Sequence, residues 1–272
     1  MAKFRKLLKG LKLLMYRPYL INAVIEHPDV YRYEFNKKYG AHYKEGLKYI
    51  DIQLFFNNES IKVSPYSYLE GSSLPTDFAL LIGLCEKYTV NDYLEIGTWR
   101  GASAANIAQY VKNCYTLNLP DETIKSQGGS DNYVNSHRFF SKSIGNITHL
   151  FGDSTQFDFE KLNTKFDLIF VDGDHSYSAV KKDTATVFKL LKNDKSIIVW
   201  HDYAFSPEDV RYEVLMGILD GCPEDKRKHL YHVSNTKCAI YLPYGYTAKT
   251  LERYALPEKY FEVNLTIKPV SK

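Results

Sequence analysis

The sequence has few cysteines, and none of them is paired at the spacing of a metal or redox motif. Cys85, Cys114, Cys222 and Cys238 stand far apart, without a C-x-x-C pair, so neither a zinc site nor a disulfide framework is indicated. Three of the four lie in apolar runs, where a free thiol behaves as a small core residue. Core thiols are typical of a reducing compartment, and we expect a cytoplasmic protein.

A long hydrophobic run and an excess of one charge are also missing. No stretch reaches the ~18 consecutive apolar residues that a membrane-spanning helix requires. The 35 basic and 32 acidic residues give a formal net charge of +3, which is too balanced for a nucleic-acid-binding surface. We therefore expect no nucleic-acid partner. At 272 residues the chain is long enough for one large α/β domain with additions, or for two small domains.

The N-terminal segment "MAKFRKLLKGLKLLMYRP" predicts a basic amphipathic helix. Its apolar side chains recur at helical spacing, and no acidic residue precedes Glu26. One interpretation is a helix that lies on an anionic membrane face, which would make the protein peripheral to the inner face of a membrane. The alternative is a helix packed on this protein or on a second copy in a homo-oligomer, with its lysines solvated. The sequence leaves both open.

The remaining chain alternates between apolar strands and helical patterns. The expected strands are "YLEI", "CYTLNL", "ITHLF", "FDLIFV", "SIIVW", "HLYHV" and "CAIYLP". Continuous apolar strands separated by helices indicate an α/β fold, doubly wound, with a mostly parallel seven-stranded sheet covered on both faces. The last two strands are too close for a helical crossover and predict an antiparallel hairpin. We divide the chain into an N-terminal helical and lid addition (1–72), a cofactor-binding domain (73–242) and a C-terminal extension (243–272).

The turn after the first of these strands excludes one common ligand. A dinucleotide-binding turn, G-x-G-x-x-G, needs a second glycine for close approach of the pyrophosphate. In "YLEIGTWRGASAANIA" that position carries Trp99, and the pattern is E-x-G-x-x-x-G from Glu95 to Gly101. An NAD-dependent oxidoreductase is therefore disfavoured. A carboxylate with two glycines suits a ligand that carries an ammonium group and no phosphate, such as S-adenosylmethionine.

Four motifs in this order resemble the class I S-adenosylmethionine-dependent methyltransferases, which have a Rossmann-like fold. They are "YLEIGTWRGASAANIA", "GDS", "FDLIFVDGDHSYSAVKKD" and "IIVWHDY", and the resemblance covers roughly residues 73–242. Within the class, the motifs are most similar to the macrocin-type sugar O-methyltransferases and the cephalosporin hydroxylase-like group. The resemblance implies S-adenosylmethionine contacts at Glu95, Gly97, Thr98, Gly101, Ser103, Asn118, Asp153, Ser154 and Asp172. Asn118 stands where the family usually has an acid for the ribose hydroxyls, and Asp121 is an alternative partner.

The resemblance also implies the chemistry. A sulfonium already activates the methyl group, so the enzyme mainly aligns an acceptor hydroxyl and removes its proton. Asp172, His201 and Asp202 match positions that hold Mg²⁺ in metal-dependent relatives, and the imidazole admits Mn²⁺ as well. His175 is the preferred general base because an imidazole titrates near neutral pH, with Asp174 as the alternative base or as a helix cap.

We therefore expect an S-adenosylmethionine-dependent O-methyltransferase that acts on a saccharide or a glycosylated small molecule, assisted by a divalent metal. A non-catalytic S-adenosylmethionine-binding scaffold or regulator is the main alternative. Tyr66 and Tyr68 lie where relatives place a lid over the substrate, although packing is the commoner role of such tyrosines. We expect Gly101→Val to abolish cofactor binding and to leave the fold intact. The C-terminal extension could either close the pocket or form a dimer contact.

Overall fold

The computed structural model describes residues 2–57 and 60–270. Its α-helices are α1 (Ala2–Tyr16), α2 (Asn22–Ile25), α3 (Pro28–Tyr43), α4 (Pro75–Lys87), α5 (Ala102–Ile107), α6 (Asp121–Ser126), α7 (Asp131–Ser136), α8 (Tyr177–Lys189) and α9 (Tyr212–Gly221). Its strands are β1 (Tyr49–Ile50), β2 (Asp92–Ile96), β3 (Asn113–Asn118), β4 (Ile147–Phe151), β5 (Leu168–Val171), β6 (Ile197–Trp200), β7 (Ala204–Ser206), β8 (Asp209–Val210), β9 (Leu230–Val233) and β10 (Ala239–Tyr241).

The main sheet has eight strands in the order β1-β9-β10-β6-β5-β2-β3-β4. β2 pairs in parallel with β3 and β5, and the parallel pairing continues outward to β4 and β6. β10 runs antiparallel to both β6 and β9, which confirms the hairpin expected from the sequence. All seven expected strands form. The eighth strand, β1, comes from the N-terminal addition and pairs in parallel with β9.

β1 was missed because two residues carry no periodicity that a sequence pattern can register. The short β7–β8 hairpin also lies outside the expected strands. It follows that part of the N-terminal addition completes the sheet.

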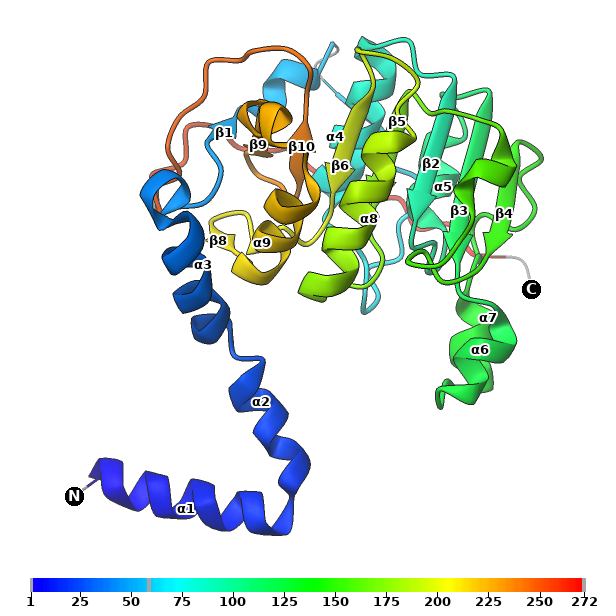
Figure 1. The fold of residues 1–272 in the computed structure, drawn as a ribbon. Coiled ribbons are helices and arrows are strands. Elements are labelled where there is room, and N and C mark those ends of the chain that lie inside the picture. The colour runs from blue at the N-terminus through cyan, green and yellow to red at the C-terminus, as the bar shows by residue number, and fades with distance from the viewer. Residues whose placement is uncertain (1, 58–59, 271–272) are drawn as a thin grey trace.

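Helices cover both faces of the sheet, as the continuous apolar strands predict (Figure 1). One face packs against α3, α8 and α9, with Ile96, Val171 and Trp200 pointing toward them. The other face packs against α4 and α5, and receives alternate residues of the same strands, such as Phe170 and Val199. Side chains on a strand alternate between faces, so a run that is apolar at every position is needed to fill two cores. The four cysteines are free and buried.

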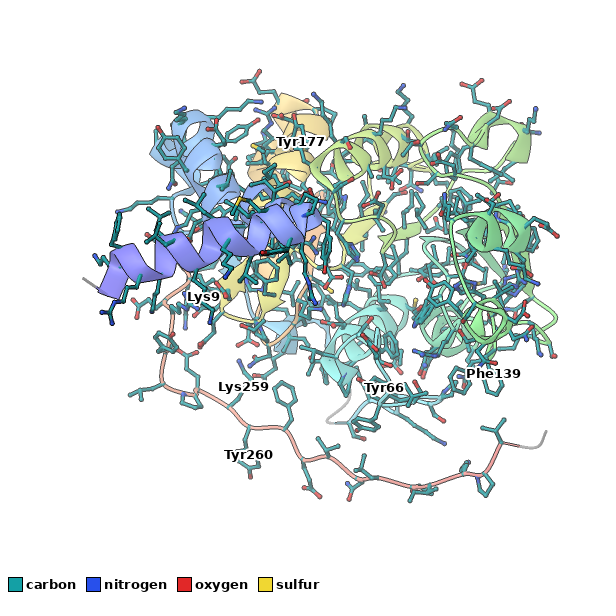
Figure 2. The ribbon with its side chains drawn as sticks, turned by 90° about the horizontal axis from the view of Figure 1, so that it is seen from below. Lys9, Tyr66, Phe139, Tyr177, Lys259 and Tyr260 are labelled. Carbon is teal, nitrogen blue, oxygen red and sulfur yellow. The ribbon has the colours of Figure 1, made fainter. Side chains whose placement is uncertain are left out.

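The two chain ends behave differently. α1 lies apart from the sheet and is joined to it through α2 and α3 (Figure 1). The C-terminal segment runs extended along the outside of the molecule past Lys259 and Tyr260, at the lower edge of the view in Figure 2. Lys249 bridges Tyr49 of β1, and the Lys259 ammonium lies 2.7 Å from the Asp51 carboxylate. The first part of this extension is thus fastened at the β1 edge. No helix in the described ranges is long and apolar enough to cross a membrane.

Candidate active site

The glycine loop between β2 and α5 packs closely against its neighbours. Gly97 has φ +97°, and a Cβ there would lie 1.9 Å from the Asp172 carbonyl oxygen. Gly101 has φ +73°, and a Cβ there would lie 2.1 Å from Ser141 Oγ. Both positions need glycine for the backbone itself. The expectation that Gly101→Val leaves the fold intact is therefore wrong, because the space a valine needs is filled by Ser141.

Glu95 lies beneath this loop, fully buried at the end of β2. Its Oε2 accepts a 2.8 Å hydrogen bond from the Tyr93 hydroxyl, while Oε1 has no hydrogen-bond partner among the described residues. Burial raises the pKa of Glu95 to about 8, against the opposing effect of the Tyr93 and Ser103 hydroxyls. The side chain stands behind the wall of the site and does not line a cavity found in the described structure.

A cavity of roughly 1270 Å³ opens at the carboxyl ends of the parallel strands. Ligand pockets commonly measure ~300–1,000 Å³, so this one has room for a cofactor and an acceptor together. Nine of the sequence-predicted site residues line it: Gly97, Asn118, Asp153, Ser154, Asp172, Asp174, His175, His201 and Asp202. A smaller adjoining cavity is lined by Thr98, Gly101 and Ser103. The structure therefore gathers at one edge nearly all residues that the motifs predicted.

On the β3–β4 side of the cavity, polar side chains already have local partners. Asp153 accepts hydrogen bonds from the backbone N–H and the hydroxyl of Thr155, at 2.9 and 2.8 Å. Ser154 donates to Asp183 at 3.1 Å, and burial raises the pKa of Asp183 to about 6. Asn118 lines the cavity, whereas Asp121 instead pairs with Arg138 at 2.8 Å. Asn118 is thus better placed than Asp121 to meet a ligand in this cavity.

On the β5–β6 side, His201 is buried between three carboxylates. Its Nε2 lies 3.0 Å from Oδ2 of Asp77, a fully buried residue of α4. Its Nδ1 lies 3.0 Å from Asp172 and 3.3 Å from Asp202, at ion-pair distance but without hydrogen-bond alignment. Burial acts to lower the pKa of His201, but the carboxylates outweigh it, Asp172 most, and the pKa lies well above its ordinary value. His201 is accordingly an imidazolium that holds the acids together.

Asp202 is the centre of this acidic group. His175 Nε2 lies 2.9 Å from its Oδ2, and the Lys237 ammonium forms an ion pair with its Oδ1. Burial acts to raise the pKa of Asp202, but His175 and His201 outweigh it and hold the pKa well below its usual range. Asp202 also has φ +50°, a conformation that costs free energy in a non-glycine residue and clusters at functional sites.

Asp174, the alternative base, lies just before the helix α8. Its Oδ1 accepts a 2.8 Å hydrogen bond from the backbone N–H of Ser176, the N-cap of α8. A carboxylate at that position also favours the positive end of the helix dipole. The side chain of His175 is one-third exposed and lines the cavity. The geometry therefore favours His175 over Asp174 for proton removal.

The expected metal ligands are only partly arranged for a metal. Within residues 2–57 and 60–270, one group could offer three donors to an ion: Asp172, His175 and Asp202. His201, which the sequence suggested, has both ring nitrogens facing carboxylates, so it has no lone pair to give. Both oxygens of Asp202 already face cationic or N–H groups. These residues fit a divalent ion poorly as they stand.

Sequence reasoning missed Asp77 and Lys237. Asp77 lies far ahead of the β5 and β6 motifs in the sequence, and only its place at the start of an apolar helix marked it, as an ordinary N-terminal acid.

 Lys237 stands in the turn between two short strands, where a lysine is ordinarily solvated. Neither residue belongs to a motif, so only the folded chain shows that both meet Asp202 or its neighbour His201.

An aromatic group forms another part of the cavity wall. Trp99, with φ +44°, has its ring centroid 4.6 Å from that of Tyr133 and 5.0 Å from that of His137. The Arg100 guanidinium lies 4.6 Å above the Trp99 ring. All four residues line the cavity. A flat aromatic face beside polar groups suits a ring-shaped ligand.

The segment before α4 covers the glycine loop. Asn106 of α5 accepts a 2.7 Å hydrogen bond from the Ser64 N–H and donates one of 2.9 Å to the Pro65 carbonyl. Tyr66, labelled in Figure 2, lines the smaller cavity, whereas Tyr68 is mostly exposed. Residues 70–72 reach the main cavity. This segment has the position of a lid, held in place by Asn106.

The strand order, the reversed β10 and the glycine loop after β2 together define the class I methyltransferase fold. Residues 94–203 match the family model described as "Methyltransferase domain". Over this range, which is less than half of the chain, the protein is similar to methyltransferase domains. The matched range contains the glycine loop, His175 and Asp202.

Similarity to individual proteins is low. An uncharacterized protein of Acanthamoeba polyphaga mimivirus is 25% identical over 146 residues, which are 51% of this chain and 65% of that protein. The O-methyltransferase from Bacillus cereus in complex with S-adenosylhomocysteine is 16% identical, with a TM-score of 0.44, over 64% of this chain and 84% of that one. An amino pentose methyltransferase from Micromonospora echinaspora is 15% identical, with a TM-score of 0.37, over 51% of this chain and 54% of that one. At such values none of them specifies the acceptor.

Proposed function

We propose that the protein transfers a methyl group from S-adenosylmethionine to a hydroxyl oxygen of a saccharide or a glycosylated small molecule. The observation that carries this proposal is the pair formed by His175 and Asp202 in the cavity wall. Asp202 faces Nε2 of His175 and so favours a proton on that nitrogen, which leaves Nδ1 to accept one. The pair stands beside the glycine loop of the methyltransferase domain.

The chemistry follows from this arrangement. The acceptor oxygen attacks the methyl carbon of the sulfonium, the carbon–sulfur bond breaks, and the sulfur leaves as a neutral thioether. His175 takes the hydroxyl proton, and Asp202 stabilises the imidazolium that results. The cavity volume allows both molecules to bind at once, which supports in-line alignment of the oxygen with the methyl group.

A saccharide suits the aromatic part of the cavity wall. Trp99 and Tyr133 line the cavity with their rings close together, and the apolar face of a sugar ring packs on aromatic surfaces. Arg100, Gln127 and His137 surround them with hydrogen-bonding groups for hydroxyls. An acceptor of this kind would use both features, whereas a wholly apolar acceptor would leave the polar groups unpaired.

Assistance by Mg²⁺ or Mn²⁺ stays a prediction from the family resemblance. If an ion binds, Asp172, His175 and Asp202 are the residues that could hold it, and it would act as a Lewis acid on the acceptor oxygen. That use of His175 as a ligand would conflict with its use as a base. No step proposed above depends on the ion.

The test is methyl transfer from labelled S-adenosylmethionine into a panel of free sugars, glycosides and non-glycosylated alcohols. Transfer to glycosides, with S-adenosylhomocysteine as co-product, is the expected result. A control with Gly97→Val, which the backbone of Asp172 cannot accommodate, should show neither binding nor transfer. Tight binding of S-adenosylhomocysteine without transfer to any acceptor would instead favour the non-catalytic scaffold.

We further propose that α1 lies on an anionic membrane surface. Phe4, Leu7, Leu8, Leu11 and Met15 share one face of the helix, and all are exposed. Basic residues flank this face: Lys3, Arg5, Lys6, Lys9, Lys12 and Arg17. A second copy of the same helix would bring like charges together, whereas anionic headgroups complement them. In Figure 1, α1 lies on the side of the sheet from which α6 and α7 extend, and the cavity is lined from α7.

Vesicle binding tests this surface. The full-length protein should bind vesicles of phosphatidylserine and phosphatidylcholine, and binding should weaken steeply with salt because exposed charges are screened within ~8 Å at physiological ionic strength. Replacing Lys3, Lys6 and Lys9 with Gln should weaken it by ~1 kcal/mol per charge. A matched control replaces three exposed lysines elsewhere, Lys112, Lys142 and Lys195. Equal effects of the two triple variants, or a dimer that persists in place of vesicle binding, would contradict the proposal.

A further inference from the structure

Lys237 contacts the acidic group of the cavity from outside the motifs. It ends the turn between β9 and β10, and its backbone N–H donates a 2.9 Å hydrogen bond to Asp77 Oδ1. Its ammonium forms an ion pair with Asp202 Oδ1, and its side chain is 21% exposed and lines the cavity. The residue is therefore fixed at both ends, by one buried carboxylate and by one in the site.

The same cluster alternates in charge. Asp77 faces His201, His201 faces Asp172 and Asp202, and Asp202 faces Lys237. Each carboxylate in this series has a cationic neighbour within ion-pair distance. A divalent ion at Asp172, His175 and Asp202 would have to displace the ammonium from Asp202 and would then lie beside it. Like charges at such a distance repel strongly in a partly buried site.

We propose that the Lys237 ammonium is the resident cation of the acceptor pocket and takes the place of a divalent metal ion. The proposal rests on the methyl transfer proposed above and names how its acceptor is polarised. Asp202 holds the ammonium beside His175, since both side chains contact that one carboxylate. An N–H of the ammonium that is not directed at Asp202 donates to the acceptor oxygen.

In the reaction, Lys237 stabilises the negative charge that develops on the acceptor oxygen. The hydroxyl proton passes to Nδ1 of His175, the oxygen lone pair forms the new carbon–oxygen bond, and the carbon–sulfur electron pair stays on the sulfur. Lys237 keeps its proton throughout. A fixed donor of this kind is most effective when it is held in place before the reaction begins, and Asp77 and Asp202 hold Lys237 in that way.

The first experiment needs no acceptor. Mn²⁺ is titrated into the full-length protein with S-adenosylhomocysteine present, and free Mn²⁺ is followed by electron paramagnetic resonance. The wild type should bind Mn²⁺ weakly, and Lys237→Met should bind it at least ~10-fold more tightly because Asp202 is freed. Lys237→Arg, which keeps the charge, should resemble the wild type. Lys182→Met removes another lysine of the cavity wall, one that forms no ion pair with Asp202 in the described structure, and controls for the general loss of positive charge.

The second experiment uses an acceptor found in the labelled-transfer panel. Activity of the wild type should survive chelation, and Lys237→Met should lower kcat by ~10²–10³ with little change in S-adenosylhomocysteine affinity. Stoichiometric tight Mn²⁺ binding by the wild type, or loss of its activity in chelator with recovery on adding Mn²⁺, would overturn the proposal. If no acceptor is methylated at all, the proposed function fails while the Mn²⁺ titration still decides the role of Lys237.

Discussion

The two walls of the cavity are built in different ways. The wall formed after β2, β3 and β4 consists of backbone turns and of neutral or locally paired side chains, such as Gly97, Asn118 and Asp153. The wall formed after β5 and β6 consists of charged groups that neutralise one another, with Asp202 at the centre. The first wall uses contiguous motifs, whereas the second is completed by Asp77 and Lys237 from outside them.

We expect the first wall to serve cofactor binding and the second wall to serve the reaction. A turn that fixes its own backbone can hold a cofactor with little help from distant residues, because its hydrogen bonds are local. A charged cluster inside a protein is stable only when each charge is paired. Changes on the charged wall should therefore alter turnover or stability and spare cofactor affinity.

Among the substitutions that test this difference between the walls, His175→Ala should have the largest effect, on the rate of methyl transfer. Loss of a general base costs ~10²–10⁴ in rate, while the affinity for S-adenosylhomocysteine should stay within about twofold because His175 belongs to the charged wall. Single-turnover kinetics and calorimetry measure the two quantities. Asp174→Ala is the matched control, since it removes a helix-start hydrogen bond and should cost ~0.5–2 kcal/mol of stability and little rate. A larger rate loss in Asp174→Ala than in His175→Ala would reverse the assignment of the base.

The next largest effect is expected from Asp77→Asn. Asp77 accepts from His201, from the backbone N–H of Leu74 and from that of Lys237, so its loss removes the charge that compensates a buried imidazolium. Breaking a buried ion pair costs ~3–5 kcal/mol, and urea unfolding should show a decrease of that order. Asp158→Asn, which breaks an exposed pair with Lys161, should cost ~0–1 kcal/mol. Similar urea unfolding midpoints for the two variants would show that the stability of the charged wall does not depend on Asp77.

A smaller, pH-dependent effect on stability is expected from Glu95, which lies behind the wall formed after β2, β3 and β4. The pKa of Glu95 is raised to about 8 in the folded protein, above the ~4.3 of an unfolded chain. The folded state therefore binds a proton that the unfolded state releases, and this contribution to stability is complete below about pH 4 and is lost as the pH rises toward 8. Its slope is at most ~1.4 kcal/mol per pH unit.

Glu95→Gln should remove that slope, because glutamine keeps the shape of the protonated acid without the titration. Urea unfolding of the wild type and the variant at several pH values between 4.5 and 8 measures the difference. Parallel stability curves for the two proteins would mean that Glu95 is already ionised in the folded state, and that its unpaired Oε1 meets a donor beyond the described contacts.

The strands and most of one wall could be predicted from the sequence because both depend on local pattern. The continuous apolar runs predicted all seven expected strands, and the motifs placed Asp172 and Asp202 at adjacent strand ends. The contact of His201 with Asp77 could not be predicted in this way, because Asp77 lies on α4, outside the motifs. Contacts between side chains that are distant in the sequence leave no periodic pattern, so the pairing of Lys237 with Asp202 could not be predicted. The strand β1, with two residues, is too short to show a pattern.

The pairing of β1 also has a consequence for how the chain folds. Residues 49–50 find their partner strand in residues 232–233, so the edge of the sheet closes through a contact of very high sequence separation, and such contacts form slowly. During synthesis, β1 leaves the ribosome long before β9 exists. Until then its backbone groups stay unpaired, and the nascent chain carries an open strand that a chaperone, or another nascent chain, can engage.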